Sequence, residues 1–275
     1  MPPTNPTEPT GTDTRSTDET NCTAPESARE TANEPAIDPP ADEGYHAVVI
    51  GGGPAGCAAS LFCARAGLQT LQLENGRSTL QKCAYVENYL GFPPGIAPRE
   101  LLELMGEHVA RTECLVRSAT VETVRRCEDG FEVFVDGERI PTRTVLAASW
   151  SKSDYLEELG VETEQEEGGP VYEIVTDSEG RTNVEGLYAA GRITGTPHQA
   201  LVSAGDGARV ALNLISELIP PFYNDWVAPA GYYEGYDKEI PVGVEEISHE
   251  ERRSREEHGR AWMREWFDDE VYSSH

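Results

Sequence analysis

The chain has 275 residues, of which 38% are hydrophobic, and 22 basic against 49 acidic side chains give it a net charge of −27 at pH 7. The hydrophobic content suffices for a substantial core. The negative charge excludes a nucleic-acid-binding surface, because such a surface needs a basic face that displaces counterions. Lysine is nearly absent, and repulsion among so many carboxylates is tolerated best where salt screens it, so we expect a halophilic, cytoplasmic protein.

The first residues differ from the rest of the chain. Residues 1–43 are rich in Thr, Pro, Glu and Asp with almost no large apolar side chain, so we expect a disordered acidic leader. No apolar run approaches the roughly 20 residues that span a membrane, and no signal peptide follows Met1. The six cysteines form no C-x-x-C pair, which favours a reducing compartment, and no metal site is expected.

Apolar runs and alternation predict an α/β order of elements. Strands are expected over residues 45–50 and 69–74, with a small-residue helix over 55–66 between them and an amphipathic helix over 97–111. Asp-Gly dipeptides at 129–130 and 136–137 predict hairpin turns in a small β-meander. Its three strands are expected over residues 121–126, 131–135 and 144–148.

The C-terminal half is predicted to close the domain and then extend it. A polar stretch holds a short helix candidate over 154–159 and a strand candidate over 170–175. A buried strand over 186–191 and an apolar helix over 199–218 follow. We expect a single Rossmann-like domain over residues 44–220, then an aromatic and charged extension over 221–275. Its helix, 248–268, opens with Ser248 and Glu251 in capping-box spacing.

A dinucleotide fingerprint lies between the first two expected elements. Gly51, Gly53 and Gly56 have G-x-G-x-x-G spacing after a strand, and Glu74 ends the next strand, where a carboxylate binds ribose. Glycine there allows a tight turn and close approach of a pyrophosphate to a helix N-terminus. The expected ligand-binding residues are Gly51, Gly53, Pro54, Ala55, Gly56 and Glu74. The alternative to a nucleotide site is a glycine turn that binds no ligand. The fingerprint alone does not distinguish NAD from FAD.

Two further segments resemble a known family. Val86-Glu87-Asn88-Tyr89 resembles the V-E-N-[WY] stretch of low-molecular-weight thioredoxin reductases, in the pyridine nucleotide-disulfide oxidoreductase superfamily. Residues 182–191 resemble that family's T-x-x-x-G-[VIL]-[FY]-A-A-G strand, and His198-Gln199-Ala200 resembles its R-Q-A. The resemblance covers about residues 45–218 and implies a Rossmann-like FAD-binding domain. The resemblance also implies six further FAD-binding residues, namely Asn88, Gly191, Arg192, His198, Gln199 and Ala200.

Departures from the family alter this expectation. Arg192 stands where the family has the Asp that holds the ribityl hydroxyls, and Ala147-Ala148-Ser149-Trp150 replaces its A-T-G-A turn. The segment between Ser149 and Gly191 is too short for the family's NADPH domain, which also carries its C-x-x-C. Gly205 and Gly207 offer no second cradle, because they fall inside an expected helix.

These observations together predict an FAD-dependent oxidoreductase that takes electrons from an external donor, either a nicotinamide or a small redox protein. Cys83, near the expected flavin, is a candidate catalytic thiol, although a lone cysteine is more often inert. A non-catalytic FAD-binding protein, structural or redox-sensing, is the rival, and an NAD-dependent dehydrogenase is a third reading. The aromatic extension is a candidate homodimer contact. The substrate is not indicated.

Overall fold

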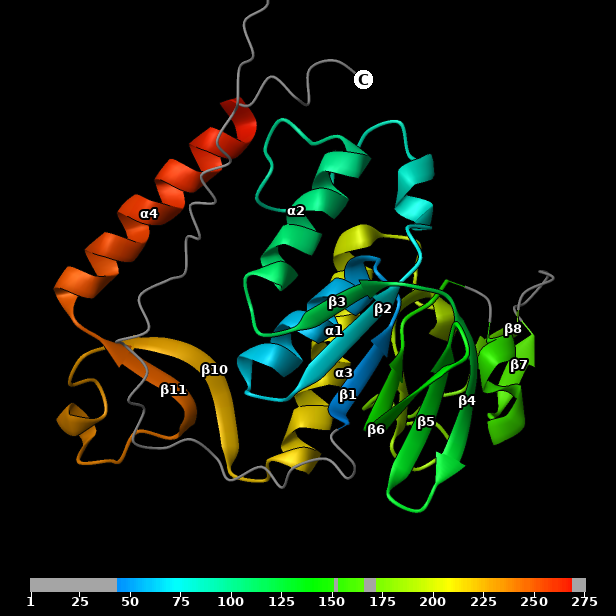
Figure 1. Cartoon of the computed structure of the whole chain (residues 1–275). Coiled ribbons are helices and arrows are strands. Elements are labelled where there is room, and N and C mark those ends of the chain that lie inside the picture. The colour runs from blue at the N-terminus through cyan, green and yellow to red at the C-terminus, as the bar shows by residue number, and fades with distance from the viewer. Residues whose placement is uncertain (1–43, 151–152, 166–171, 269–275) are drawn as a thin grey trace, which may run out of the picture. The chain divides into compact units, whose positions relative to one another are not determined.

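The computed structural model describes residues 44–150, 153–165 and 172–268, and the leader expected over residues 1–43 lies outside these ranges. A seven-stranded sheet forms the centre, and six of its strands follow the order β3-β2-β1-β6-β5-β4 (Figure 1). The seventh strand, β9, pairs with β6 off this path. The parallel strands are β1 (Tyr45–Ile50), β2 (Thr70–Glu74), β3 (Leu115–Ser118), β6 (Glu138–Ala147) and β9 (Leu187–Ala189). The α/β class with a parallel sheet is thereby confirmed, although β3 was not among the expected strands.

β1 is buried on both faces, as its unbroken apolar run predicts for a central parallel strand. Ala47 and Val49 belong to the core cluster formed with two helices, whereas Val48 and Ile50 belong to the cluster formed with the meander. The sheet therefore separates two layers of apolar packing.

Helices α1 (Pro54–Arg65) and α3 (Ala200–Leu218) share one of these layers. A Cβ at Gly207 would lie 2.1 Å from the carbonyl oxygen of Ala55, so only glycine permits α3 to approach α1 this closely. Gly207 is therefore a helix-packing residue inside α3, as expected. Helix α2 (Pro98–Ala110) packs on α1 through Val109.

The meander continues the central sheet. β4 (Val121–Cys127) pairs antiparallel with β5 (Gly130–Val135), and β5 pairs with the first half of β6. The expected start of the third strand at residue 144 is wrong, because β6 begins at Glu138. Pro141 has no N–H and so obscures the strand pattern, yet it pairs with Glu132 in the ladder.

A short insert connects β6 to β9. The helix expected over 154–159 is the 3-10 helix η4 (Asp154–Leu159), whose Tyr155 and Leu156 are buried in the meander-side core. The strand expected over 170–175 corresponds to β8 (Tyr172–Ile174), which pairs antiparallel with β7 (Thr163–Gln165). The described residues of this insert form no second nucleotide-binding fold.

No strand is expected in the aromatic segment, but the structure forms β10 (Phe222–Pro229) and β11 (Val242–Ile247), which pair in parallel. The pattern gave no signal because parallel partners are joined by a long connection and not by a hairpin turn. The connection contains the 3-10 helix η6 (Glu234–Tyr236), and Trp226 lies edge-on to Tyr232 with ring centroids 4.9 Å apart.

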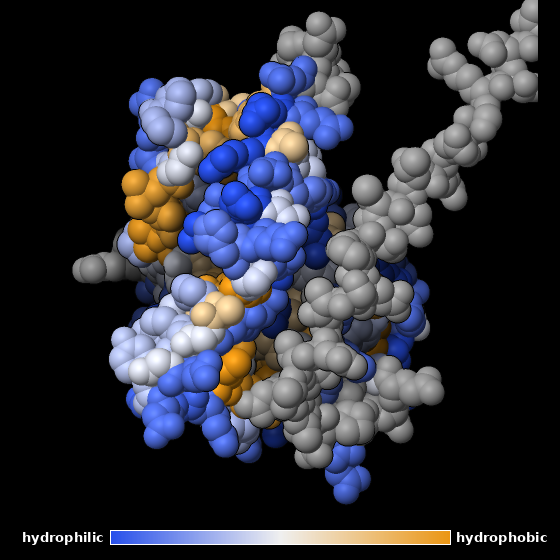
Figure 2. Space-filling model, turned by 90° about the vertical axis from the view of Figure 1, so that its left-hand side faces the viewer, coloured by the Kyte–Doolittle hydropathy of each residue, from blue (hydrophilic) through white to orange (hydrophobic). Residues whose placement is uncertain are grey.

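Helix α4 (His249–Asp268) ends the described chain, and the Glu251 N–H donates to the Ser248 hydroxyl over 3.1 Å, which confirms the expected cap. No residue of α4 is buried, but the Arg111 guanidinium lies 4.4 Å from the ring centre of Trp262. Figure 2 shows this side of the molecule as mostly hydrophilic, with apolar surface in separate patches. Among the described helices, none has the length and apolar character needed to cross a membrane. The expected domain boundary at residue 220 stays a prediction.

Candidate functional site

The glycine turn after β1 is shaped by the protein's own backbone. Gly51 has a φ of +134°, and a Cβ there would lie 2.4 Å from the Ala148 carbonyl oxygen. A Cβ at Gly56 would lie 1.9 Å from the Gly51 carbonyl oxygen, and one at Gly52 would lie 2.6 Å from the Glu74 Cβ. Glycine is therefore required at all three positions by packing, whatever the ligand. The requirement at Gly52 was missed, because the fingerprint counts only the other glycines.

Gly53 differs from these three glycines. A Cβ there would meet only the Ser78 hydroxyl oxygen, at 3.6 Å, which is an ordinary contact. Gly53 is the N-cap of α1, Pro54 follows in the first turn, and no side chain within the described ranges caps the helix. The first N–H groups of a helix have no partner within it, and they attract an anion. The absence of a side chain at Gly53 thus leaves open space beside the start of α1, as a phosphate cradle requires.

Glu74 lies beside this cradle at the carboxyl end of β2. Its Oε2 accepts a hydrogen bond from the Gly76 N–H over 2.6 Å, and its Oε1 has no partner among the described residues. One carboxylate oxygen is therefore free to accept from a ribose hydroxyl. The Ser78 hydroxyl, close to Gly53, was not a sequence-predicted candidate, because only the fold brings the loop after β2 back over the turn. These residues fit the adenosine diphosphate half of a dinucleotide.

On the other side of the turn, segments far apart in sequence meet. The Asn88 side-chain amide donates to the Gln199 side-chain oxygen over 2.7 Å. Gln199 is the N-cap of α3, and Ala200 is its first residue. Gly191, with a φ of +79°, follows β9, and its missing Cβ would lie 2.7 Å from the Ala55 Cβ. The structure thus brings together Asn88, Gln199 and Ala200, and it places Gly191 against α1.

Arg192, in the 3-10 helix η5 (Gly191–Thr194), forms an ion pair with Glu173 of β8, and the two side chains are only 13% and 16% exposed. Its guanidinium also lies 5.8 Å from the ring centre of Trp150. Arg192 therefore ties the insert to the end of β9.

Trp150, one residue beyond Ser149 after β6, is the centre of a small cluster. His198 meets it edge-on at 5.0 Å between ring centroids, and the Lys82 ammonium lies 5.9 Å from its ring centre. Trp150 and Lys82 were not predicted as site residues. Cation–π contact between remote segments has no sequence signature, although the unusual Trp in a small-residue turn was a signal. The Ser149 hydroxyl is hydrogen-bonded to the buried Tyr155 hydroxyl, 2.8 Å away.

The described cysteines differ in exposure, with Cys127 intermediate between the exposed Cys83 and the three buried cysteines. Cys83 is exposed and is the C-cap of the 3-10 helix η3 (Thr79–Lys82). Burial raises the pKa of Cys57 and of Cys114 to about 11, and that of Cys63 to about 12. A thiol with so high a pKa is almost never a thiolate at neutral pH, so these three are packing residues.

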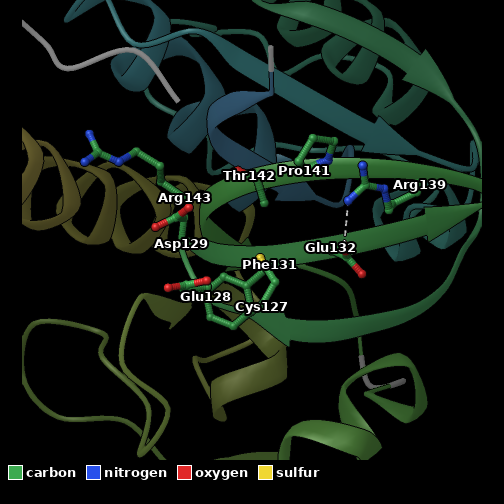
Figure 3. A pocket seen from close by; sticks show the side chains of 9 residues that line it. All are labelled: Cys127, Glu128, Asp129, Phe131, Glu132, Arg139, Pro141, Thr142 and Arg143. Atoms are coloured by element: carbon green, nitrogen blue, oxygen red, sulfur yellow. Dashed lines mark hydrogen bonds and ion pairs between the residues drawn. The ribbon is translucent and has the colours of Figure 1, made fainter. Parts of the chain in front are cut away.

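A separate pocket of about 210 Å³ lies on the meander, away from the glycine turn (Figure 3). Carboxylates and arginines line it, and Arg139 donates to Glu132 across 2.7 Å. Its volume is below that of typical small-molecule sites. It is therefore not the dinucleotide site.

Comparisons with known proteins agree with this geometry. A family model described as glucose inhibited division protein A matches residues 46–117. The bifunctional thioredoxin reductase/thioredoxin of Mycobacterium leprae is 38% identical over 123 residues, covering 43% of this chain and 27% of that protein. The thioredoxin reductase of Aquifex aeolicus is 32% identical over 111 residues, covering 39% of this chain and 34% of that protein. The chain spans about a third or less of the length of these relatives.

Solved structures give the same answer for the fold. A thioredoxin reductase from Gloeobacter violaceus superposes with a TM-score of 0.58 at 18% identity, covering 66% of this chain and 98% of that one. An oxidoreductase from Agrobacterium tumefaciens superposes with the same TM-score at 16% identity, covering 64% and 99%. The described chain has a fold like the Rossmann-like FAD-binding domain of thioredoxin reductases, within the pyridine nucleotide-disulfide oxidoreductases.

Proposed function

We propose that the protein is an FAD-dependent oxidoreductase that receives its electrons from an external donor. The observation that carries this proposal is the open face of Gly53 at the uncapped N-terminus of α1, with the Glu74 carboxylate beside it. Similarity to thioredoxin reductases supports FAD over NAD for this cradle.

Each residue has a defined task in this proposal. The first N–H groups of α1 bind the pyrophosphate, the free oxygen of Glu74 accepts from the adenosine ribose, and the Ser78 hydroxyl donates to a phosphate oxygen. Bound FAD would supply the isoalloxazine ring that accepts and passes on electrons. The protein contributes position and electrostatics.

The donor is proposed to be external because the insert between β6 and β9 contains only η4 and the β7–β8 hairpin among its described residues. Hydride transfer requires a nicotinamide held at about 3 to 3.5 Å from its acceptor, which needs a second binding site for the rest of that dinucleotide. A nicotinamide bound elsewhere or a small redox protein must then deliver the electrons. A salt-rich cytoplasm and a homodimer through the aromatic extension stay predictions.

A non-catalytic FAD-binding protein is the second candidate. It is favoured by Arg192, which is engaged with Glu173, and by the absence of a C-x-x-C pair from the sequence. In this alternative the cofactor serves as a structural or redox-sensing element.

Electron transfer by purified protein separates the two. The protein, kept at high salt and supplied with FAD, is mixed with NADPH as donor and ferricyanide as acceptor, and turnover is compared with that of free FAD. Gly53→Ala is the matched control, because it blocks the cradle while its methyl group makes only an ordinary contact with the Ser78 hydroxyl oxygen, at 3.6 Å. Turnover above free FAD that Gly53→Ala abolishes supports an enzyme, whereas FAD binding without added turnover supports the alternative.

A further inference from the structure

The two sides of the glycine turn offer a ligand very different polar groups. A dinucleotide whose pyrophosphate lies at Gly53 extends over β2 on one side, where Glu74 is, and over β6 and β9 on the other. We name these the β2 side and the β9 side of the site. The β2 side holds groups that still need partners, namely the first N–H groups of α1 and the Oε1 of Glu74.

On the β9 side, the carboxylates are already used. Asp206 of α3 accepts from the Gly191 N–H over 2.7 Å, from the Thr196 hydroxyl over 3.1 Å and from Arg209 over 2.7 Å. Glu173 is paired with Arg192, and that pair is mostly covered. A flexible polyol needs acceptors as well as donors, and each of these two carboxylates already accepts from protein donors, with Glu173 only 16% exposed.

The remaining β9-side groups are tied to one another or exposed. Asn88 donates to Gln199, and His198 lies against Trp150, so binding a ligand through them requires an existing contact to be exchanged. Such an exchange yields little net free energy, because one hydrogen bond replaces another. Asn88, His198 and Gln199 are all exposed, so they do not enclose a ring.

From this contrast we propose that the chain binds FAD through its adenosine diphosphate half, and that FAD is a dissociable ligand exchanged with solution. This inference rests on the proposed function and specifies how its cofactor is held. The β2 side supplies the affinity, and the β9 side adds little because Glu173 is already paired with Arg192.

Titration calorimetry of the full chain at high salt tests the proposal with three probes, FAD, ADP and FMN. We expect FAD and ADP to bind with Kd values within about tenfold of each other, and FMN to show no binding at about 100 times the Kd of FAD. FAD bound more than about 100-fold tighter than ADP, or FMN bound comparably to FAD, would overturn it. Failure of both FAD and ADP to bind would instead overturn the proposed function.

A second test looks for variants that bind FAD more tightly. In Arg192→Asp/Glu173→Gln, a carboxylate is placed after β9 while the acidic partner at residue 173 is removed, and we expect the Kd of FAD to fall by about tenfold with that of ADP unchanged. Arg192→Asn/Glu173→Gln is the matched control, which breaks the same ion pair without adding a carboxylate. Equal FAD affinity in the two variants, with ADP binding intact, would contradict the assignment of weak β9-side binding to Arg192.

Discussion

The two sides of the dinucleotide site are built from different parts of the polypeptide. The β2 side relies on backbone: a glycine turn, the N–H groups of a helix start and one carboxylate at a strand end. The β9 side relies on side chains from four remote segments, gathered around Trp150 and Arg192. A backbone-built site persists as long as the turn folds, whereas a side-chain-built site changes whenever one residue is replaced.

The strongest challenge to this contrast is to destroy the turn itself. In Gly56→Ala the new methyl group would lie 1.9 Å from the Gly51 carbonyl oxygen, so the turn must move. We expect the free energy of unfolding to fall by about 3 kcal/mol or more, with nucleotide binding lost. Denaturant titration at high salt measures it. The control is Gly106→Ala in α2, which meets nothing within 4 Å and should be neutral or stabilising.

Gly53→Ala isolates binding from folding. Because its methyl group would touch only the Ser78 hydroxyl oxygen, at 3.6 Å, stability should not change. The methyl group lies in the path of the pyrophosphate, so we expect the Kd values of both ADP and FAD to rise on the order of 100-fold. Calorimetry and thermal melting give the two readouts. Normal ADP binding in this variant would show that the phosphates lie elsewhere.

Glu74→Gln weakens the β2 side more mildly. Loss of one charge-assisted hydrogen bond of about 1.5 to 3 kcal/mol should raise the Kd of ADP by about tenfold or somewhat more. The Gly76 N–H keeps an acceptor in the glutamine side chain, so the local turn should be retained. An unchanged Kd, measured in parallel with wild-type protein, would mean that Glu74 does not face the ribose.

Changes on the β9 side should matter less for ADP. Asn88→Ala and Gln199→Ala each remove one member of an exposed 2.7 Å hydrogen bond, so a stability loss of at most about 1 kcal/mol is expected. The Kd of ADP should change by less than about threefold, because ADP does not extend to this side. A large rise in the Kd of ADP in either variant would show that the two sides act as one site.

The test with the smallest expected effect on the protein is chemical modification, which leaves the fold unchanged. At pH 8 a maleimide should label the exposed Cys83 much faster than Cys57 or Cys114, since burial holds the pKa of both at about 11 and thus keeps them protonated. Peptide mapping by mass spectrometry reads the order, and rapid modification of Cys57 at pH 8 would show that the α1 layer opens.

Sequence patterns predicted the structure correctly where the residues that determine it are close together in the chain. The strand at residues 45–50, the helix expected from residue 55 and observed from Pro54, and the cap at Ser248 each depend on neighbours within a few positions. The patterns failed where pairing is remote, as in the parallel pair β10–β11, or where one residue hides a pattern, as Pro141 does in β6.

The sequence by itself determined the α/β order, the glycine turn and the position of Glu74, because backbone geometry and hydrophobic period act over short distances. Only the tertiary structure decided what Arg192 does. From the sequence it is an arginine at an acidic position of the family, and its partners, Glu173 and Trp150, come from other segments. Side-chain pairing across a fold depends on where the sheet brings its strand ends, and no local pattern encodes that.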